Sequence, residues 1–415
     1  MTASRSIWRN TTLGDVARWG SGGTPSTSDG SLYGGTIPWV VIGDLTDGPV
    51  YDTAATLTDA GLTKSAAKLV PPDAILVAMY GASIGRLGLT TREVTTNQAI
   101  AHAIPHPGLN LKYLFFYLMS QKRSLVHAGK GAAQPNIGQG VLKAWPIVFP
   151  ESLDEQRRIV DLLEEHLSRL DTAEQGLANA LARSETLLTA GLWHATHGLD
   201  ELAPVELQSI AEVRLGRQRS PKNHTGDRMR PYLRAANVDW DSLRLEDVKE
   251  MQFSETEQKT YQLETGDILL TEASGSPAEV GKSVIYRGMP ADVCFQNTLL
   301  RVRCHSADPE FVQKYLLAEA RAGRFMPEAR GVGINHLGRA RLATLPIQTP
   351  SPEHQSTAVA ACRELVEGVE RSKATIIDQA KRSAGLRRSL LAAAFSGRLT
   401  SNASDVSAAK EMIGA

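Results

Sequence analysis

The chain repeats itself once, and this duplication constrains the fold more than any single motif. The matching stretches lie about 190 to 200 residues apart throughout the chain. Each half has a mixed region of about 150 residues and then a proline-free segment of about 45. A unit that occurs twice predicts internal pseudo-two-fold symmetry. The matching pairs are Leu13–Trp19 with Leu207–Val213, Ala74–Ala78 with Asp267–Thr271, Asn97–Ile100 with Asn297–Leu300, and Trp145–Ile147 with Leu345–Ile347.

The mixed regions predict two compact α+β domains. Short β-rich runs such as Ile37–Ile42 and Leu299–Val302 are interrupted by Gly and Pro. Each region also holds one helix-like stretch near its end, at Leu111–Ser120 and Pro309–Ala322. We therefore expect a globular domain over residues 1–150 and a second over residues 200–350.

Two segments, residues 151–199 and 351–400, contain no proline apart from Pro352 at the start of the second, and they predict two long helices. Apolar residues recur in both at heptad spacing, and the register is kept after a shift of 199 residues. This pattern predicts an antiparallel coiled coil that holds the two domains about 65 Å apart, although plain interdomain helices remain the alternative. A short tail, residues 401–415, follows. The expected helix–helix seam consists of Val160, Leu163, Leu167, Leu170, Leu177, Leu181, Val359, Val366, Val369, Ile376 and Leu390.

Composition restricts the class of protein. Lys plus Arg number 45 and Asp plus Glu number 45, so a nucleic-acid surface requires local clustering of charge. Cys294, Cys304 and Cys362 fit neither a disulfide framework nor a metal pair, and we expect them to be buried in a protein of a reducing compartment. No apolar run reaches the length of a signal peptide or of a membrane span. We therefore expect a cytoplasmic protein.

Taken together and in order, several motifs resemble the specificity subunits of type I restriction-modification systems. They extend over nearly the whole chain, and the first helix departs from the pattern only at its end, Leu192–Gly198. The first half contributes Gly22–Ser26, Ile37–Trp39, Gly43–Leu45, Tyr80–Gly85, Thr96–Ala99, Gln134–Ile137 and Glu155–Val160. The second half contributes Gly216–Lys222, Met229–Arg234, Gly266–Leu270 and Leu386–Leu399.

The resemblance implies a binding and assembly subunit without catalytic residues. Each mixed domain would be a target-recognition domain that reads one half of a bipartite site on double-stranded DNA. The helices would set the gap between the half-sites and dock two methyltransferase (modification) subunits, and two restriction subunits, which are translocases with a nuclease, would join them. The chain itself would need no cofactor, because S-adenosylmethionine, ATP and Mg²⁺ would belong to those partners.

Candidate DNA contacts are clearest in the second domain. Between Arg214 and Arg234 the chain carries seven basic residues and one acid, Asp227. Arginine neutralises phosphates and grips guanine bidentately, and Gly216, Pro221 and Gly226 predict a loop, although a solvated charged face is the alternative. Asn237 is a candidate for reading adenine, or else a turn or capping residue. The candidates in this domain are Arg217, Arg219, Lys222, Arg228, Arg230 and Asn237.

Polar loops supply the candidates in the first domain. Residues 21–27 are rich in Gly, Ser and Thr, which can approach a phosphate backbone through N–H and hydroxyl groups. A second polar loop lies near residue 134. For both, a plain flexible loop is the alternative. The candidates are Thr24, Ser26, Lys130, Gln134 and Asn136.

Signatures of catalysis and metal binding are missing from the sequence. The ten histidines include no His-Glu-x-x-His pair, and no Asn-Pro-Pro-aromatic or Asp-Pro-Pro-aromatic methyltransferase motif occurs. Ser276–Ser283 imitates a phosphate-binding loop, but Ser276 replaces a required glycine. Two alternatives stay open. A cryptic nuclease or methyltransferase would methylate or cut DNA alone, whereas a coiled-coil adaptor would retard no DNA even with methyltransferase partners.

Overall fold

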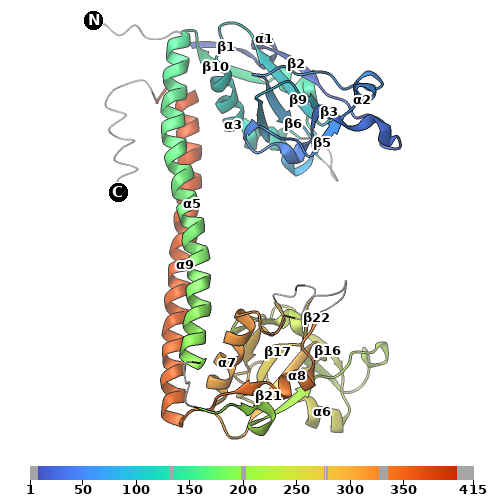
Figure 1. Ribbon diagram of the computed structural model, residues 1–415, viewed down its shortest axis with the longest axis vertical. Helices are drawn as coiled ribbons and strands as arrows, with labels where there is room; N and C mark the ends of the chain where they lie inside the picture. The colour runs from blue at the N-terminus through green and yellow to red at the C-terminus, as the bar shows by residue number, and fades with distance from the viewer. Residues whose placement is uncertain are drawn as a thin grey trace, which may run out of the picture. The chain divides into compact units, whose positions relative to one another are not determined.

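The computed structural model describes residues 8–129, 135–197, 202–274, 276, 279–326 and 335–399 (Figure 1). The chain divides into unit 1, residues 1–176 with 379–415, and unit 2, residues 177–378. Two long helices, α5 (Leu153–His197) and α9 (Pro352–Phe395), each contribute to both units. The expected tail, 401–415, and the candidates Lys130 and Gln134 lie outside the described residues.

The globular part of unit 1 is built on a sheet with the strand order β2-β9-β6-β7-β4. Its central strand, β6, is apolar and buried along its whole length, and α3 packs on the sheet through Tyr113 and Leu114 (Figure 1). A smaller sheet has the order β5-β3-β8, and β1 pairs with β10. The elements are β1 (Trp8–Thr12), α1 (Leu13–Val16), β2 (Ala17–Ser21), β3 (Tyr33–Val40), β4 (Gly48–Val50), β5 (Ala55–Leu57), α2 (Asp59–Thr63), β6 (Ile75–Ala78), β7 (Leu87–Thr90), β8 (Thr95–Thr96), β9 (Ile100–Pro105), α3 (Leu111–Ala128), α4 (Gln139–Lys143) and β10 (Pro146–Pro150).

The globular part of unit 2 repeats this plan. Its main sheet has the order β12-β21-β17-β19, its smaller sheet the order β16-β13-β20, and β11 pairs with β23. The buried strand β17 takes the place of β6, and α7 takes that of α3. The elements are β11 (Val205–Glu206), β12 (Ala211–Leu215), β13 (Met229–Leu233), β14 (Val238–Asp239), β15 (Ser242–Leu243), β16 (Lys249–Gln252), α6 (Glu255–Tyr261), β17 (Ile268–Thr271), β18 (Ala273–Ser274), β19 (Ser283–Ile285), β20 (Cys294–Phe295), β21 (Leu299–Cys304), α7 (Pro309–Arg321), β22 (Asn335–His336), α8 (Arg339–Ala343) and β23 (Pro346–Ile347).

A buried glutamine fixes the start of each long helix by the same hydrogen bonds. In unit 1, Gln156 accepts from the N–H of Asn110 at 2.7 Å and donates to the carbonyl of Pro150 at 2.8 Å. In unit 2, Gln355 accepts from the N–H of Asp308 at 2.9 Å and donates to Pro350 at 2.7 Å. Asn110 and Asp308 also cap α3 and α7. The repeat predicted from the sequence is therefore confirmed at the level of single hydrogen bonds.

Hydrogen bonds also align the two repeats more finely than the sequence does. Tyr117 and Tyr315 donate from their hydroxyls to the carbonyls of Pro146 and Pro346, at 2.5 and 3.2 Å. Strands β3 and β8 are parallel in unit 1, as β13 and β20 are in unit 2. Just after β8 the N–H of Asn97 donates to the carbonyl of Val40, and just after β20 the N–H of Gln296 donates to the carbonyl of Leu233. Asn97 is therefore equivalent to Gln296. The sequence comparison paired Asn97 with Asn297 because both are asparagine. That pairing is wrong by one residue, since the two repeats are offset by 199 residues at this point.

The two long helices run antiparallel where they meet inside unit 1. Ser383 of α9 donates its hydroxyl to Glu174 of α5 at 2.8 Å. Arg387 of α9 pairs with Asp171 and with Glu174, the latter at 3.2 Å. The same ends pack on the domain, since Leu163 and Leu391 lie in one core with α3 (Figure 1).

Inside unit 2 the helices meet with the same antiparallel order. Lys373 of α9 pairs with Glu185 of α5 at 2.6 Å. Gly191 lies almost two turns after Glu185 on α5. Leu365 of α9 packs directly against it, and a Cβ at residue 191 would clash with the leucine side chain. Leu188 and Leu192 pack with Cys362 and Val369. The predicted fold class, two repeated α+β domains with two long antiparallel helices, is confirmed.

The expected seam residues fall into three groups by burial. Val160, Leu163 and Leu167 are buried in the core of unit 1, and Val359 lies in that of unit 2. Val369 is buried between the helices. The remaining residues are partly or largely exposed, and the apolar stripe is weakest in the middle of each helix. They are Leu170, Leu177, Leu181, Val366, Ile376 and Leu390.

The three cysteines are inert by position. Cys294 and Cys362 are buried, as expected from the sequence, whereas Cys304 is half-buried. Burial raises the pKa of Cys294 and of Cys304 to about 12, and that of Cys362 to about 11. Across the described residues, no cluster of His, Cys, Asp or Glu is arranged to hold a metal ion. No helix in the described part of the chain is long and apolar enough to cross a membrane.

Candidate nucleic-acid interface

In unit 2, the loop of residues 216–228 joins β12 to β13 and carries the predicted basic cluster. The loop leaves β12 at Gly216, where a Cβ would clash with the carbonyl oxygen of Gln296. In unit 1, the loop of residues 22–32 leaves β2 at Gly22, where a Cβ would clash with the carbonyl oxygen of Thr96. The N–H of Gly22 donates to the carbonyl of Ile100 and that of Gly216 to the carbonyl of Leu299, which are equivalent at the offset of 199. The loops that carry Ser26 and Arg219 therefore begin at equivalent points of the two repeats. We call them the first and the second recognition loop in chain order.

Arg217 is held in place by the domain. Its Nε donates to Glu257 at 2.7 Å, its Nη1 donates to the carbonyl of Gln252, and its guanidinium lies 4.9 Å from the ring centre of Phe253. Glu257 also forms the capping box of α6 with Ser254. Burial alone would raise the pKa of Glu257, but the Ser254 N–H and Arg217 outweigh it and lower that pKa. Arg217 thus ties the start of the second recognition loop to α6.

The other basic candidates of the second recognition loop differ in how they are used. Arg219 and Lys222 are exposed, and the structure gives neither an ion pair within the described residues. Arg228 lies 3.6 Å from Glu255. Arg230 follows in β13, and its buried Nε has no hydrogen-bond partner in the described part of the chain. Arg219 and Lys222 are therefore the candidates placed most openly for a phosphate or a base edge.

Acidic residues outside the basic cluster neutralise part of it. Arg214 pairs with Glu212, and Arg234 pairs with Asp247 at 2.5 Å. A hydrogen bond from Lys249, and then the charges of Lys249 and Arg234, lower the pKa of Asp247 against the effect of burial. The cluster that the sequence presents as seven basic residues therefore offers less free charge than their number suggests.

Asn237 occupies a buried position in the turn after β13. Its amide nitrogen donates to the carbonyls of Arg244 and Asp247 at 2.9 and 3.3 Å, and its amide oxygen accepts from the N–H of Arg234. These are the bonds of a capping residue, the alternative given by the sequence. Reading a base would require breaking them, and a DNA contact by Asn237 stays a prediction.

The first recognition loop presents hydroxyl groups rather than cations. Thr24 donates its hydroxyl to Gln98, and the exposed Ser26 shares a 2.8 Å hydrogen bond with Ser28. The loop is anchored below by Trp39, whose indole N–H donates to the carbonyl of Gly23 at 3.2 Å. Asn136, a candidate from the second polar loop, is exposed, and its backbone forms an antiparallel bridge with Tyr80. Among the described residues, no hydrogen bond joins Asn136 to Thr24.

Cations beside the first recognition loop were missed by the sequence analysis. A Cβ on Gly23 would clash with the backbone of Ala66, so the segment after α2 crosses directly over the loop. Lys64 and Lys68 in this segment are exposed. Burial, and then the charges of Arg18 and Lys68, lower the pKa of His102 on the neighbouring strand. No local pattern reveals this grouping, because the lysines lie about 40 residues after the loop in sequence.

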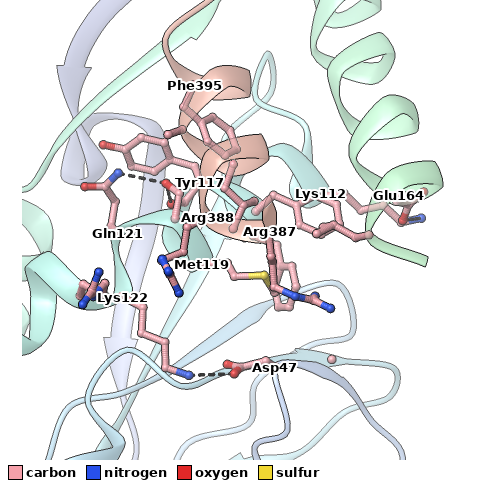
Figure 2. A pocket seen from close by; sticks show the side chains of 18 of the residues that line it. Asp47, Lys112, Tyr117, Met119, Gln121, Lys122, Glu164, Arg387, Arg388 and Phe395 are labelled. Carbon is pink, nitrogen blue, oxygen red and sulfur yellow. Dashed lines mark hydrogen bonds and ion pairs between the residues drawn. The ribbon is translucent and has the colours of Figure 1, made fainter. Parts of the chain in front are cut away.

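A groove of about 1290 Å³ in unit 1 lies between α3, the start of α5 and the end of α9 (Figure 2). Lys122 of α3 reaches Asp47 at 2.8 Å, and Lys112 pairs with Glu164 of α5 at 2.7 Å. Phe395 packs edge-on against Tyr117, with ring centres 5.4 Å apart. Figure 2 shows Arg387 and Arg388 of α9 among the side chains that line this groove.

The equivalent contact in unit 2 has its charges reversed. Lys112 of α3 corresponds to Glu310 of α7, and Glu164 of α5 corresponds to Arg363 of α9. Glu310 and Arg363 form an ion pair at 2.7 Å, the same distance as the pair in unit 1. The duplication has therefore preserved the position of this contact while exchanging its charges.

Comparison with known proteins identifies relatives of both halves. A family model described as "Type I restriction modification DNA specificity domain" matches residues 6–183 and 200–382. The specificity subunit of the type I restriction enzymes EcoR124I and EcoR124II of Escherichia coli is 27% identical over 178 residues, 41% of this chain and 43% of that protein. The MjaIX specificity subunit of Methanocaldococcus jannaschii is 27% identical over 161 residues, 38% of this chain and 37% of that protein. The matched stretch thus spans less than half of either relative.

Solved structures share the fold at low sequence identity. A chain from a structure described as the basis of complex assembly and conformational transition of the type I R-M system has a TM-score of 0.75. The match covers 95% of this chain and 99% of that one at 18% identity. The HsdS subunit of Thermoanaerobacter tengcongensis gives a TM-score of 0.53 at 16% identity, over 96% of this chain and 99% of its own. These matches support the fold.

Proposed function

Because this chain belongs to the family of type I restriction-modification specificity subunits, we propose that each of its globular domains reads one half of a bipartite DNA site. The observation that carries the proposal is the equivalence of the two recognition loops, which leave β2 and β12 at Gly22 and Gly216. Two copies of one binding plan suit two half-sites. Arg219 and Lys222 would contact the second half-site, and Thr24, Ser26, Lys64 and Lys68 the first.

The helices would set the gap between the half-sites and dock two methyltransferase subunits. Their lengths, 45 residues for α5 and 44 for α9, support a spacer role, since a helix of that length measures about 65 Å. In this proposal two restriction subunits complete the complex on cytoplasmic DNA. S-adenosylmethionine, ATP and Mg²⁺ serve those partner subunits, and this chain selects the sequence without catalysing a reaction.

The experiment is to co-express the full chain with the methyltransferase subunit of the same genome and to map methylated adenines on a plasmid. We expect a bipartite motif with a fixed central gap. Arg219→Ala with Lys222→Ala should relax one half of that motif only, and Arg183→Ala, an exposed change on α5, should leave the motif unchanged. Loss of both halves together in the loop variant would contradict the separate reading of half-sites. A stable complex that methylates nothing and binds no DNA would favour the adaptor alternative.

A further inference from the structure

The internal repeat raises the question of what keeps α5 paired with α9 rather than with α5 of a second copy. Since α9 repeats α5 at an offset of 199 residues, α5 of a second copy offers an approximate substitute for α9. Each α9 residue has an α5 equivalent 199 positions earlier. When the α9 residues in the antiparallel contacts are replaced by these equivalents, the paired positions lie symmetrically about residue 179. The heptad register alone therefore permits α5 to pair with α5 of another copy.

Charge distinguishes the two arrangements. Within the chain, Glu185 meets Lys373, of which the side chain is only 14% exposed, at 2.6 Å. The α5 equivalent of Lys373 is Glu174. An α5–α5 pair would therefore place Glu185 of each copy against Glu174 of the other, which makes two like-charge contacts. The same exchange would remove Arg387 from Glu174, because the α5 equivalent of Arg387 is Leu188.

Side-chain size distinguishes them as well. Leu365 packs on α5 only because residue 191 is glycine, and a Cβ there would clash with the leucine. The α9 equivalent of Gly191 is Leu390. An α9–α9 pair would therefore bring Leu365 against Leu390, with no glycine to accommodate it.

We propose that the charge and size pattern of α5 and α9 directs α5 to pair with α9, and that it excludes α5–α5 and α9–α9 pairs between two copies of the chain. The partner that the pattern rejects is the identical helix of a second copy of this chain. The proposal concerns self-association and holds whether or not either domain reads DNA. It assigns a role to Glu174, Glu185, Gly191 and Leu365 that a seam of apolar residues alone does not supply.

The test uses the full chain with Asn179→Cys, because residue 179 meets its own counterpart only in an α5–α5 pair. The deciding variant adds Glu174→Lys and Arg387→Glu, which keeps the 174–387 ion pair within the chain and turns the Glu174–Glu185 repulsion between copies into attraction. It also carries Asp171→Asn, because Asp171 pairs with Arg387 and would repel a glutamate there. The matched control adds Asp161→Lys with Arg183→Glu, which exchanges two exposed charges of α5 away from the contact. Mass photometry gives the dimer fraction, and oxidation gives the 179–179 cross-link.

We expect the Asn179→Cys chain and its control to stay monomeric without a cross-link, and the deciding variant to dimerise at least about tenfold more strongly. Thermal unfolding shows that each variant is folded. Cross-linking of the Asn179→Cys chain as readily as the deciding variant would overturn the proposal. An unchanged dimer fraction in a folded deciding variant would overturn it too.

Discussion

At the scale of single residues, equal charges have unequal roles in the second recognition loop. Arg217 has a side chain only 12% exposed and is bound to α6, whereas Arg219, two residues on, faces solvent. A charge count treats the two alike. The two arginines differ in exposure because Glu257 and Phe253, about 40 residues further along the chain, contact Arg217 and not Arg219. We therefore expect substitution of Arg217 to affect stability and substitution of Arg219 to affect DNA binding.

Arg217→Ala should destabilise unit 2. It removes an ion pair, a hydrogen bond to a backbone carbonyl and a stacking contact, and we expect the free energy of unfolding to fall by about 2 kcal/mol. Urea denaturation followed by circular dichroism measures this change. Arg219→Ala is the matched control and should alter stability by less than about 0.5 kcal/mol. Equal effects of the two substitutions would show that the anchoring of Arg217 contributes nothing.

Arg219→Ala with Lys222→Ala should make DNA binding less dependent on salt concentration. Each phosphate contact releases about 0.9 counterions, so the slope of log affinity against log salt should become less steep by about two. Fluorescence anisotropy on a duplex between about 50 and 200 mM salt measures the slope. If affinity fell with an unchanged slope, these residues would not contact phosphates.

The sequence predicts the residue scale least well. It identifies the basic loop, but it does not identify Asp247, the acid that pairs with Arg234, because this residue lies in a turn further along the chain. It also misses Lys64 and Lys68, which reach the first recognition loop through the close approach of Ala66 to Gly23. Contacts between residues far apart in the chain are set by tertiary packing, which local patterns do not encode.

At the scale of elements, the sequence predicts much more. A proline-free stretch with heptad spacing requires little tertiary information, and α5 and α9 are present as long helices. The buried strands β6 and β17 follow from short apolar runs. The pairing of the long helices is not as simple as an apolar seam, since Leu181 is 37% exposed and ion pairs hold neighbouring turns.

Glu185 makes the helix contact in unit 2 sensitive to acid. A hydrogen bond from Lys373, and then the charges of Lys373 and Arg321, lower the pKa of Glu185 below its ordinary value of 4.5, although burial opposes this. A carboxylate with a lowered pKa stabilises the folded state above its ordinary value, and this stability is lost as pH falls through the lowered value. Glu185→Gln should therefore flatten the dependence of the melting temperature on pH below about 5. Asp161→Asn is a control at an exposed site on the same helix, and an equal flattening there would contradict the role of Glu185.

At the scale of the whole molecule, the chain contains the same domain fold twice, and the two copies differ in their surface residues. The duplication itself, and hence the repeated fold, is readable from the sequence. The paired glutamines Gln156 and Gln355 show that hydrogen bonds within the domains have been kept. Lys112 with Glu164, against Glu310 with Arg363, shows that charges between domain and helix have been reversed.

The charge reversal predicts that the two domains are not freely interchangeable. A chimera with residues 8–150 in both positions would place a second Lys112 against Arg363, and a like-charge contact would replace an ion pair. We expect a loss of about 1 kcal/mol in stability, recovered when Arg363→Glu is added. Thermal unfolding of the chimera with and without that change measures the recovery. Arg371→Glu, at an exposed site on α9, is the control and should recover nothing.

The buried cysteines make this protein suitable for site-specific labelling. With pKa values raised to about 11 or 12, the three thiols remain protonated at neutral pH, and those of Cys294 and Cys362 are also buried. Cysteines introduced at Ser26 and Gln218, one on each recognition loop, would react with a maleimide dye in preference to the native residues. Energy transfer between the two dyes would then give a direct optical measure of the distance between the two recognition loops.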